Sequence, residues 1–217
     1  MKQFSIHMWK HHQELVVLAI TSFFLLAGVV QYAIGLTYVL RLTPVVIGII
    51  AALVMLYWHA PPRRKASLIM VAFLVGFIAE IVGVNTGLLF GDYTYGSAMG
   101  LKIAGVPILI GITWALVTIA AWQIVSMSPY SRGAKIFLAA CLVVIFDLIL
   151  EQYATAFGLW QWDGGIIPLK NYISWFIVAA AITTSYSLVA KQSKPSIYGA
   201  CVLPVLALYF WLMLLVR

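Results

Sequence analysis

Three carboxylic acids interrupt stretches of the sequence that are otherwise apolar. Glu80 lies within residues 66–84, and Asp147 and Glu151 lie within residues 136–157. Asp147 and Glu151 are four residues apart, so they share one face of a helix, where two carboxyl groups tend to share a proton. Carboxylic acids in apolar surroundings are suited to proton transfer. The sequence therefore predicts acid–base chemistry at these three positions.

The rest of the chain is too apolar for a soluble domain. Hydrophobic residues make up 64% of its 217 residues and charged residues 9%, whereas an average soluble domain has about 25% charged residues. A membrane-spanning helix needs about 20 largely apolar residues. Seven such segments are predicted, at residues 15–40, 42–62, 66–84, 103–131, 136–157, 171–190 and 195–216. We expect an all-α, polytopic integral membrane protein that forms one transmembrane domain over residues 1–217.

Basic residues in short loops indicate the orientation of such a protein, because they remain on the cytoplasmic side. Nine lie on the side of the N-terminus: Lys2, Lys10, Arg63, Arg64, Lys65, Arg132, Lys135, Lys191 and Lys194. Four lie on the opposite side: Arg41, Lys102, Lys170 and Arg217. We expect a multi-pass protein of the cell membrane with its N-terminus in the cytoplasm and its C-terminus outside. The net charge of +7 is then a topology signal and does not indicate a nucleic-acid partner. Residues 1–14 are expected to be an interfacial segment that leads into a retained first helix.

Two stretches around the acids share four residue types in the same order. These are Glu80, Gly87, Pro107 and Trp114 in the first stretch, and Glu151, Gly158, Pro168 and Trp175 in the second. In both, the glycine follows the glutamate by seven residues, and the tryptophan follows the proline by seven. We expect two copies of one helix–loop–helix unit, at about residues 66–125 and 134–190. Since their first helices run in the same direction, they would be parallel repeats related by an axis along the membrane normal.

The acids and the repeated tryptophans are predicted to lie in one layer of the membrane. At 1.5 Å per residue from the cytoplasmic helix ends, Glu80 lies roughly 22 Å deep, Asp147 roughly 18 Å and Glu151 roughly 24 Å. Trp114 and Trp175 lie roughly 10 Å below the outer surface of a core about 30 Å thick. A charge at membrane depth costs about 2.5–3.5 kcal/mol and usually marks function. The layer is therefore a predicted site in the outer half of the membrane.

Several classes of site lack the residues they need. The histidines, His7, His11, His12 and His59, all fall at or near the cytoplasmic edge, so we expect neither a metal site nor a histidine base for a nucleophile in the outer layer. The last span contains no lysine for a retinal Schiff base, and no glycine-rich phosphate loop is present. We expect no cofactor. A carboxylic acid can protonate an alkene, and aromatic ring faces stabilise the resulting cation by about 2 kcal/mol when water is excluded. This combination suits protonation of an isoprenoid double bond.

The motifs around the acids resemble those of the membrane carotenoid-biosynthesis proteins, the family that includes carotenoid 1,2-hydratases and bisanhydrobacterioruberin hydratase. The resemblance rests on EIVGVNTGLLFGDYTY and GVPILIGITW in the first half, and on DLILEQYATAFGLWQW and IPLKNYISW in the second. It covers about residues 70–180. The chain departs from the family at Gln152, where the family often has a proline, and this leaves open a subfamily with another substrate.

The resemblance implies addition of water across the terminal C1–C2 double bond of an acyclic carotenoid. An acid would protonate C2, and water would add to the tertiary cation at C1. The general acid would be Glu80 or the Asp147/Glu151 pair, with the other acid orienting the water. The candidate gate for water consists of Asp92 and Tyr93. The candidate partners of water or carboxyl groups are Asn85 and Asn171. The candidate walls for the polyene end are Tyr95, Trp114, Trp160, Trp162 and Trp175.

Two other functions fit the same residues. A carotenoid end-group cyclase also protonates an alkene but excludes water, and the polar groups Asn85, Asp92 and Asn171 favour hydration. A proton-coupled transporter would also use intramembrane acids and repeats, although it needs a polar path through the cytoplasmic half. Tyr95, Trp160 and Trp162 would also fit the aromatic belt of any membrane protein. The expected partners are an acyclic carotenoid, water and the lipid bilayer, and the sequence leaves the oligomeric state open.

Overall fold

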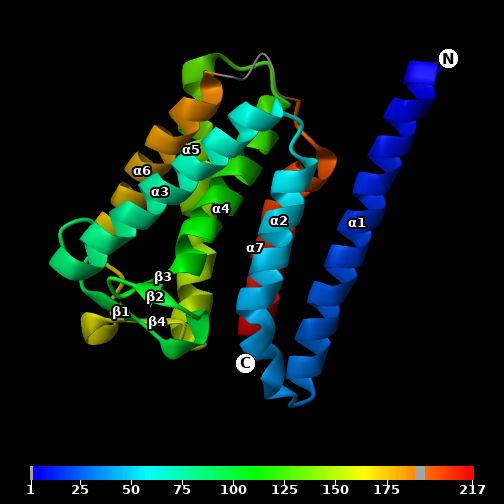
Figure 1. Cartoon of the computed structure of the whole chain (residues 1–217). Coiled ribbons are helices and arrows are strands. Elements are labelled where there is room, and N and C mark those ends of the chain that lie inside the picture. Colours follow the sequence, from blue (N-terminus) through cyan, green and yellow to red (C-terminus); the bar gives the residue numbers. More distant parts are fainter. Residues whose placement is uncertain (1, 189–193) are drawn as a thin grey trace.

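The chain folds as a bundle of helices. The computed structural model describes residues 2–188 and 194–217, with side chains from residue 11 onwards. Its α-helices are α1 (Lys2–Ala33), α2 (Thr43–Tyr57), α3 (Pro62–Thr86), α4 (Ile108–Ser126), α5 (Arg132–Ala156), α6 (Leu169–Ser187) and α7 (Ile197–Leu215). Figure 1 shows the N-terminus of α1 and the C-terminus of α7 at opposite ends of the bundle. The expected all-α architecture is confirmed.

Most of these helices are suited to a membrane. In the described part of the chain, six segments are long and apolar enough to cross one: His11–Ala33, Thr37–Tyr57, Pro62–Thr86, Ile108–Ser126, Arg132–Ala156 and Ile197–Leu215. The helix α6, in the place of the predicted sixth span, has 19 residues, as α4 does, but it includes Lys170, Asn171 and several hydroxyl side chains. It packs against α3, α4 and α5, as Figure 1 shows, so it belongs to the same bundle. Residues 189–190 of that predicted span, and Lys191 of the predicted topology signal, lie outside the described residues.

The helix ends differ from the predicted spans where glycine or proline intervenes. The first helix begins at Lys2, so the expected interfacial segment continues directly into it, and it ends before Gly35, whose φ is 91°. A 3₁₀ helix (Thr37–Leu42) then leads into α2. The predicted fourth span was too long at its start, because β2 (Lys102–Ile103) and β3 (Val106–Pro107) form a hairpin there. The helix α4 begins only after Pro107.

The helix α4 lies at the centre of the bundle. Its residues from Trp114 to Gln123 are all buried, and it contacts α2, α3, α5, α6 and α7. Glycines let α3 come close to it, because a side chain at Gly76 would overlap the ring of Trp114, and one at Gly111 would press on Phe73. The position of Trp114 is therefore fixed by packing.

A buried carboxylate joins α1 to α7. Glu14 accepts hydrogen bonds from the backbone N–H groups of Ile197 (2.6 Å) and Tyr198 (3.3 Å) at the start of α7. His59 Nε2 lies 3.0 Å from the other oxygen of Glu14. A carboxylate at a helix N-terminus satisfies free N–H groups and complements the helix dipole. Glu14 therefore has a structural role at the end of the bundle where α1 begins.

Two short strands bring the α3–α4 and α5–α6 connections together. Strand β1 (Tyr93–Tyr95) pairs antiparallel with β4 (Trp160–Trp162), with Tyr93 opposite Trp162 and Tyr95 opposite Trp160. Figure 1 shows these strands at one end of the bundle. Side chains alternate along a strand, so the aromatic residues of both strands point to one face, while Thr94 and Gln161 are exposed. The paired strands hold four aromatic rings over the helix ends.

The two predicted repeat units have similar local structure. Gly87 at the end of α3 and Gly158 just after α5 are both left-handed, with φ of 65° and 69°. Pro107 and Pro168 directly precede α4 and α6. The rings of Trp114 and Trp175 stack on each other, with centroids 4.0 Å apart and an interplanar angle of 23°. These are the features that a two-fold repeat would produce, and the repeat with its boundaries stays a prediction.

Candidate active site

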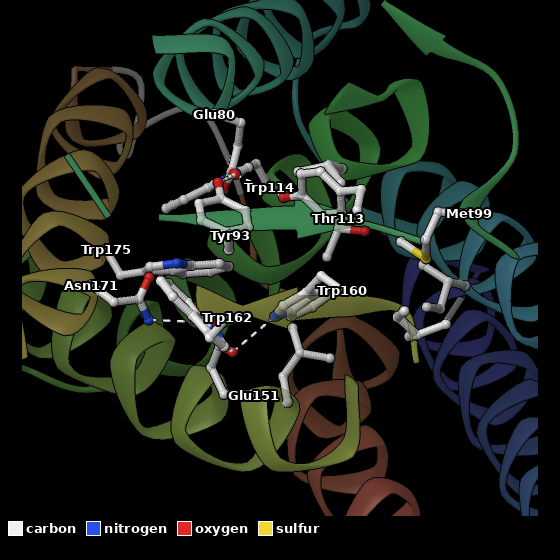
Figure 2. Close-up of a pocket in the computed structure, with 15 residues that line it drawn as sticks. Glu80, Tyr93, Met99, Thr113, Trp114, Glu151, Trp160, Trp162, Asn171 and Trp175 are labelled. Carbon is white, nitrogen blue, oxygen red and sulfur yellow. Dashed lines mark hydrogen bonds between the residues drawn. The ribbon is translucent and has the colours of Figure 1, made fainter. Parts of the chain in front are cut away.

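A small cavity lies between the β1–β4 ribbon and the helices. Its volume of about 30 Å³ is enough for one or two water molecules. Its polar and aromatic lining consists of Glu80, Glu151, Tyr93, Tyr95, Trp114, Trp160, Trp162, Trp175, Thr113 and Asn171. The apolar remainder consists of Ile47, Met99, Ile110, Leu150 and Leu159. Figure 2 shows Glu80 and Glu151 on opposite sides of the pocket, with aromatic rings between them.

Glu80, near the end of α3, is held by three hydrogen-bond donors. Its side chain is buried, with 2% of its surface exposed. The hydroxyl of Tyr95 donates to Oε2 over 2.7 Å, and the hydroxyl of Tyr93 donates to the same oxygen. Trp114 Nε1 donates to Oε1 over 3.0 Å. Donors of this kind stabilise negative charge on a carboxyl group. Both oxygens of Glu80 are therefore fixed in position.

Glu151, on α5, has an equivalent environment. Trp160 and Trp162 of β4 donate from Nε1 to Oε2 over 2.9 and 2.8 Å. The amide of Asn171 donates to Oε1 over 3.3 Å. In each half of the bundle, the glutamate thus accepts two hydrogen bonds from residues two positions apart on the strand that follows it. The alternation of side chains along β1 and β4 makes this possible.

Asp147 lies one helical turn before Glu151 and is fully buried. Its Oδ2 accepts a hydrogen bond of 3.0 Å from Asn171, so one amide joins both carboxyl groups. Within the described residues, Oδ1 of Asp147 has no hydrogen-bond partner. Two carboxyl groups held by one amide are placed to share a proton. Asp147 and Glu151 are therefore joined through the amide of Asn171.

The two tyrosines that bind Glu80 are held in their neutral form. Burial raises the pKa of both Tyr93 and Tyr95 well above the usual value of a phenol, and the neighbouring Glu80 raises each pKa further. A phenol with a raised pKa keeps its proton at neutral pH. Both side chains are therefore permanent hydrogen-bond donors to Glu80.

Most of the predicted site residues meet in the cavity. The cavity is lined by nine of the twelve: Glu80, Tyr93, Tyr95, Trp114, Glu151, Trp160, Trp162, Asn171 and Trp175. Asp147 lies behind Asn171. Asn85 and Asp92 are exposed and lie outside the lining that the described residues form. Asn85 donates to the carbonyls of Ile81 (2.8 Å) and Ala104 (3.0 Å), which fixes the hairpin turn. The backbone of Asp92 accepts from Asp163 (2.9 Å), which joins the two loops.

Some residues of the cavity were not predicted from the sequence. Ile47 comes from α2, outside both repeat units, and Met99 comes from the loop after β1. Neither differs from the many other apolar residues of the chain. Thr113 directly precedes Trp114, so it was the one polar residue that the motif could have indicated. Its hydroxyl donates to the Leu109 carbonyl (3.0 Å).

The cavity has the composition of an acid–base site. Among the described residues, no group of three or more His, Cys, Asp or Glu side chains is placed to hold a metal ion. Two carboxyl groups face the cavity from opposite sides, and indole and phenol rings form most of the remaining wall. Such a site can donate a proton on one side, accept one on the other, and stabilise a cation between them.

Comparison with known proteins identifies related sequences. The family described as "Carotenoid biosynthesis protein" matches residues 41–217. A protein from Haloarcula japonica named bisanhydrobacterioruberin hydratase is 30% identical over 171 residues, which cover 74% of this chain and 52% of the relative. The chain thus spans about half the length of this curated relative. No solved structure matches the chain.

Proposed function

We propose that this chain, which belongs to the carotenoid biosynthesis protein family, is a hydratase that adds water to the terminal C1–C2 double bond of an acyclic carotenoid. One observation supports this most strongly. Glu80 and Glu151 face one aromatic cavity from opposite sides, and each is held by three hydrogen-bond donors. The name of the relative, bisanhydrobacterioruberin hydratase, agrees with a hydratase activity.

Glu80 is the proposed general acid. It transfers its proton to C2, the π electrons form the new C–H bond, and the positive charge develops on C1. The three donors around Glu80 stabilise the carboxylate that remains, as an acid that protonates a poor base requires. Tyr93 and Tyr95 keep their own protons because of their raised pKa values, so they remain donors throughout.

The Asp147/Glu151 pair is the proposed base. A water molecule attacks C1 with an oxygen lone pair and passes one proton to this pair, which leaves a tertiary alcohol. The pair then releases this proton to solvent and Glu80 regains one from solvent before the next turnover, so the net reaction adds one water molecule. A polar surface hollow lined by Gln152, Gln161 and Tyr172 shares Trp162 with the cavity and is the proposed entrance for water.

The aromatic wall is suited to the cation between the two acids. Trp114 and Trp175 are stacked, and Trp160 and Trp162 direct their N–H groups to Glu151. A cation within about 6 Å of a ring face gains about 2 kcal/mol when it is desolvated. The rings therefore lower the barrier to protonation while they exclude bulk water.

Two alternatives are less well supported. A cyclase needs the same protonation without water, whereas the polar hollow beside Trp162 favours access for water. A transporter needs a polar path beyond the site. The next α4 residues, Ala115, Leu116 and Val117, are apolar and fully buried or nearly so. The excess of basic residues near the N-terminal side favours a cytoplasmic N-terminus, which places the cavity in the outer half of the membrane.

Product mass tests the proposed activity. The chain is expressed in a host that makes lycopene, and the extracted pigments are analysed by mass spectrometry. A hydratase adds the mass of one water molecule for each end that reacts, and growth in ¹⁸O-labelled water places the label in the product. A cyclase gives products of unchanged mass, and a transporter gives no new pigment. Either result, with the protein present in the membrane, would refute the proposal.

A further inference from the structure

A second hollow lies beside the cavity, on the surface that faces the membrane. It is a groove between α2, α3 and α4 with a volume of about 350 Å³. The helix α2 contributes Gly48, Ala51, Ala52 and Met55. Opposite them, Phe73 of α3 is one of the walls. Every residue that lines the groove is apolar, so water and ions are poor occupants.

The groove and the cavity are lined by neighbouring residues of two helices. On α2, Ile47 lines the cavity and the next residue, Gly48, lines the groove. On α4, Thr113 and Trp114 line the cavity, while Ala115 lines the groove. Neighbouring residues on the same helices therefore face both hollows, which places them next to each other.

Helix packing accounts for Ala51 and Ala115, which are 1% and 0% exposed, but it does not account for Gly48 and Ala52. Small side chains in membrane helices usually allow two helices to touch. Here α2 packs mainly on α4 and α7, and α3 packs mainly on α4 and α6. Among the described residues, no atom lies within 4 Å of the place where a side chain on Gly48 would begin. Gly48 and the exposed Ala52 therefore leave open space.

We propose that this groove binds the conjugated chain of the substrate, so that the polyene enters from the lipid and its end reaches the cavity. This inference rests on the proposed hydratase function. The cavity, at about 30 Å³, admits only a small part of a long substrate, and the rest needs an apolar channel that starts at the cavity. The groove is apolar and has lining residues directly next to those of the cavity on α2 and α4. The unbranched, polarisable side chains of Met55 and Met70 and the ring of Phe73 suit a flat, polarisable chain.

The direction of the groove agrees with this substrate. Gly48 and Met55 are seven residues apart on α2, so the groove extends about 10 Å along the helix. It leads from the part of α2 that lines the cavity toward the end of α2 that joins α3. A bound polyene would therefore lie roughly along the membrane normal, and the reacting end would lie between Glu80 and Glu151.

Filling the groove tests the proposal. Gly48→Trp places an indole in the open space, and Ala52→Trp does so one turn further along α2. The matched control is Ile49→Trp, since Ile49 is the neighbouring, exposed residue on the same helix and does not line the groove. Each full-length variant is reconstituted in phospholipid nanodiscs. Hydration is measured with lycopene and with geranylacetone, a short isoprenoid ketone that has the same dimethyl-substituted terminal double bond.

We expect both groove variants to hydrate lycopene at least about tenfold more slowly than wild type. Geranylacetone hydration should stay within about twofold, since the short probe fits without the groove. Ile49→Trp should match wild type with both substrates. Equal lycopene hydration in Gly48→Trp, Ala52→Trp and Ile49→Trp would overturn the inference.

A binding measurement separates this inference from the proposed reaction. In protein with Glu80→Gln, the lycopene that remains bound after washing is quantified by its visible absorbance. Loss of bound lycopene on adding Gly48→Trp or Ala52→Trp, but not Ile49→Trp, supports the groove even if wild type hydrates nothing. Unchanged lycopene binding would overturn it. If the groove variants displaced phospholipid but not lycopene, the groove would be assigned to lipid. If they reduced the size of the assembly while lycopene stayed bound, the groove would be assigned to a second copy of the chain. Either result would also overturn the inference.

Discussion

The hydrogen bond from Trp114 to Glu80 gives a prediction with a built-in control. Trp114 and Trp175 stack on each other and both line the cavity, but only Trp114 donates to a carboxyl group, over 3.0 Å. Within the described residues, Trp175 donates no such bond. Changing either one to Phe keeps a ring in the stack and removes a similar ring area. Comparing the two variants therefore isolates the hydrogen bond.

The expected difference in rate between the two variants follows from the charge of the group that accepts the hydrogen bond. A hydrogen bond to a charged group contributes about 1.5–3 kcal/mol, and each 1.36 kcal/mol changes a rate about tenfold. In the transition state Glu80 has given up its proton and is a carboxylate. In the Trp114→Phe variant this carboxylate keeps two of its three hydrogen-bond donors. Trp114→Phe should therefore hydrate the carotenoid about 10- to 150-fold more slowly than Trp175→Phe.

The assay is turnover of lycopene by equal amounts of purified, membrane-reconstituted protein. Substrate is supplied above saturation, so that kcat is compared and differences in binding do not enter. A combined variant, Trp114→Phe with Trp175→Phe, shows whether the ring loss is additive. Equal rates in the two single variants would mean that the Trp114 N–H does not act on the transition state, and the role of Glu80 as the acid would lose its main support.

Two further predictions follow from packing and from the tyrosines. Gly76→Ala should destabilise the protein by about 1–3 kcal/mol in a denaturant titration and slow turnover, because the new methyl group overlaps the Trp114 ring. Gly133→Ala, which meets no described atom within 4 Å, should change neither the stability nor the turnover. Equal stability and turnover of the two variants would contradict the close contact at Gly76. Tyr93 and Tyr95 should stay protonated at about pH 11, one unit above the ordinary phenol pKa, because their pKa values are raised. The ultraviolet signal of phenolate at this pH should therefore be the same in wild type and in the Tyr93→Phe/Tyr95→Phe double variant. A signal smaller by two phenolates in the double variant would contradict the raised pKa values.

The sequence was sufficient to predict the helices and most of the polar and aromatic residues that line the cavity. Acids such as Glu80 and Glu151 in apolar runs are costly, so their presence is informative, and the helical rise placed them at the depth of Trp114 and Trp175. The structure brings these four residues to one cavity. The depth of a residue in a helix can be predicted because the rise per residue is regular and because successive helices of the bundle run in opposite directions.

Loops were harder to predict, because their side-chain directions depend on tertiary contacts. Asn85 and Asp92 stand in the same motif as Tyr93, but they point to loop partners or to the surface. The pairing of β1 with β4 involves only three residues in each strand, too few for a pattern in the sequence. The contribution of Ile47 and the open groove beside it also depend on how α2 packs, which the apolar composition of α2 does not specify.

Glu14 shows why an acid near a span needs a structural context. It is nearly as buried as the two glutamates of the cavity, with 5% of its surface exposed, but it binds the start of α7 and His59. These contacts account for both of its oxygens. It therefore offers a control for the acids of the cavity.

The most direct test of the account is the pigment made by Glu80→Gln and Glu151→Gln. Each change keeps the size of the side chain and removes the acid, and Glu14→Gln makes the same change at a buried acid outside the cavity. In cells that make lycopene, we predict no hydrated carotenoid from the two cavity variants and wild-type amounts from Glu14→Gln, with all three proteins present in the membrane. Hydrated carotenoid at wild-type levels from Glu80→Gln and Glu151→Gln would contradict the central claim that these two glutamates perform the reaction.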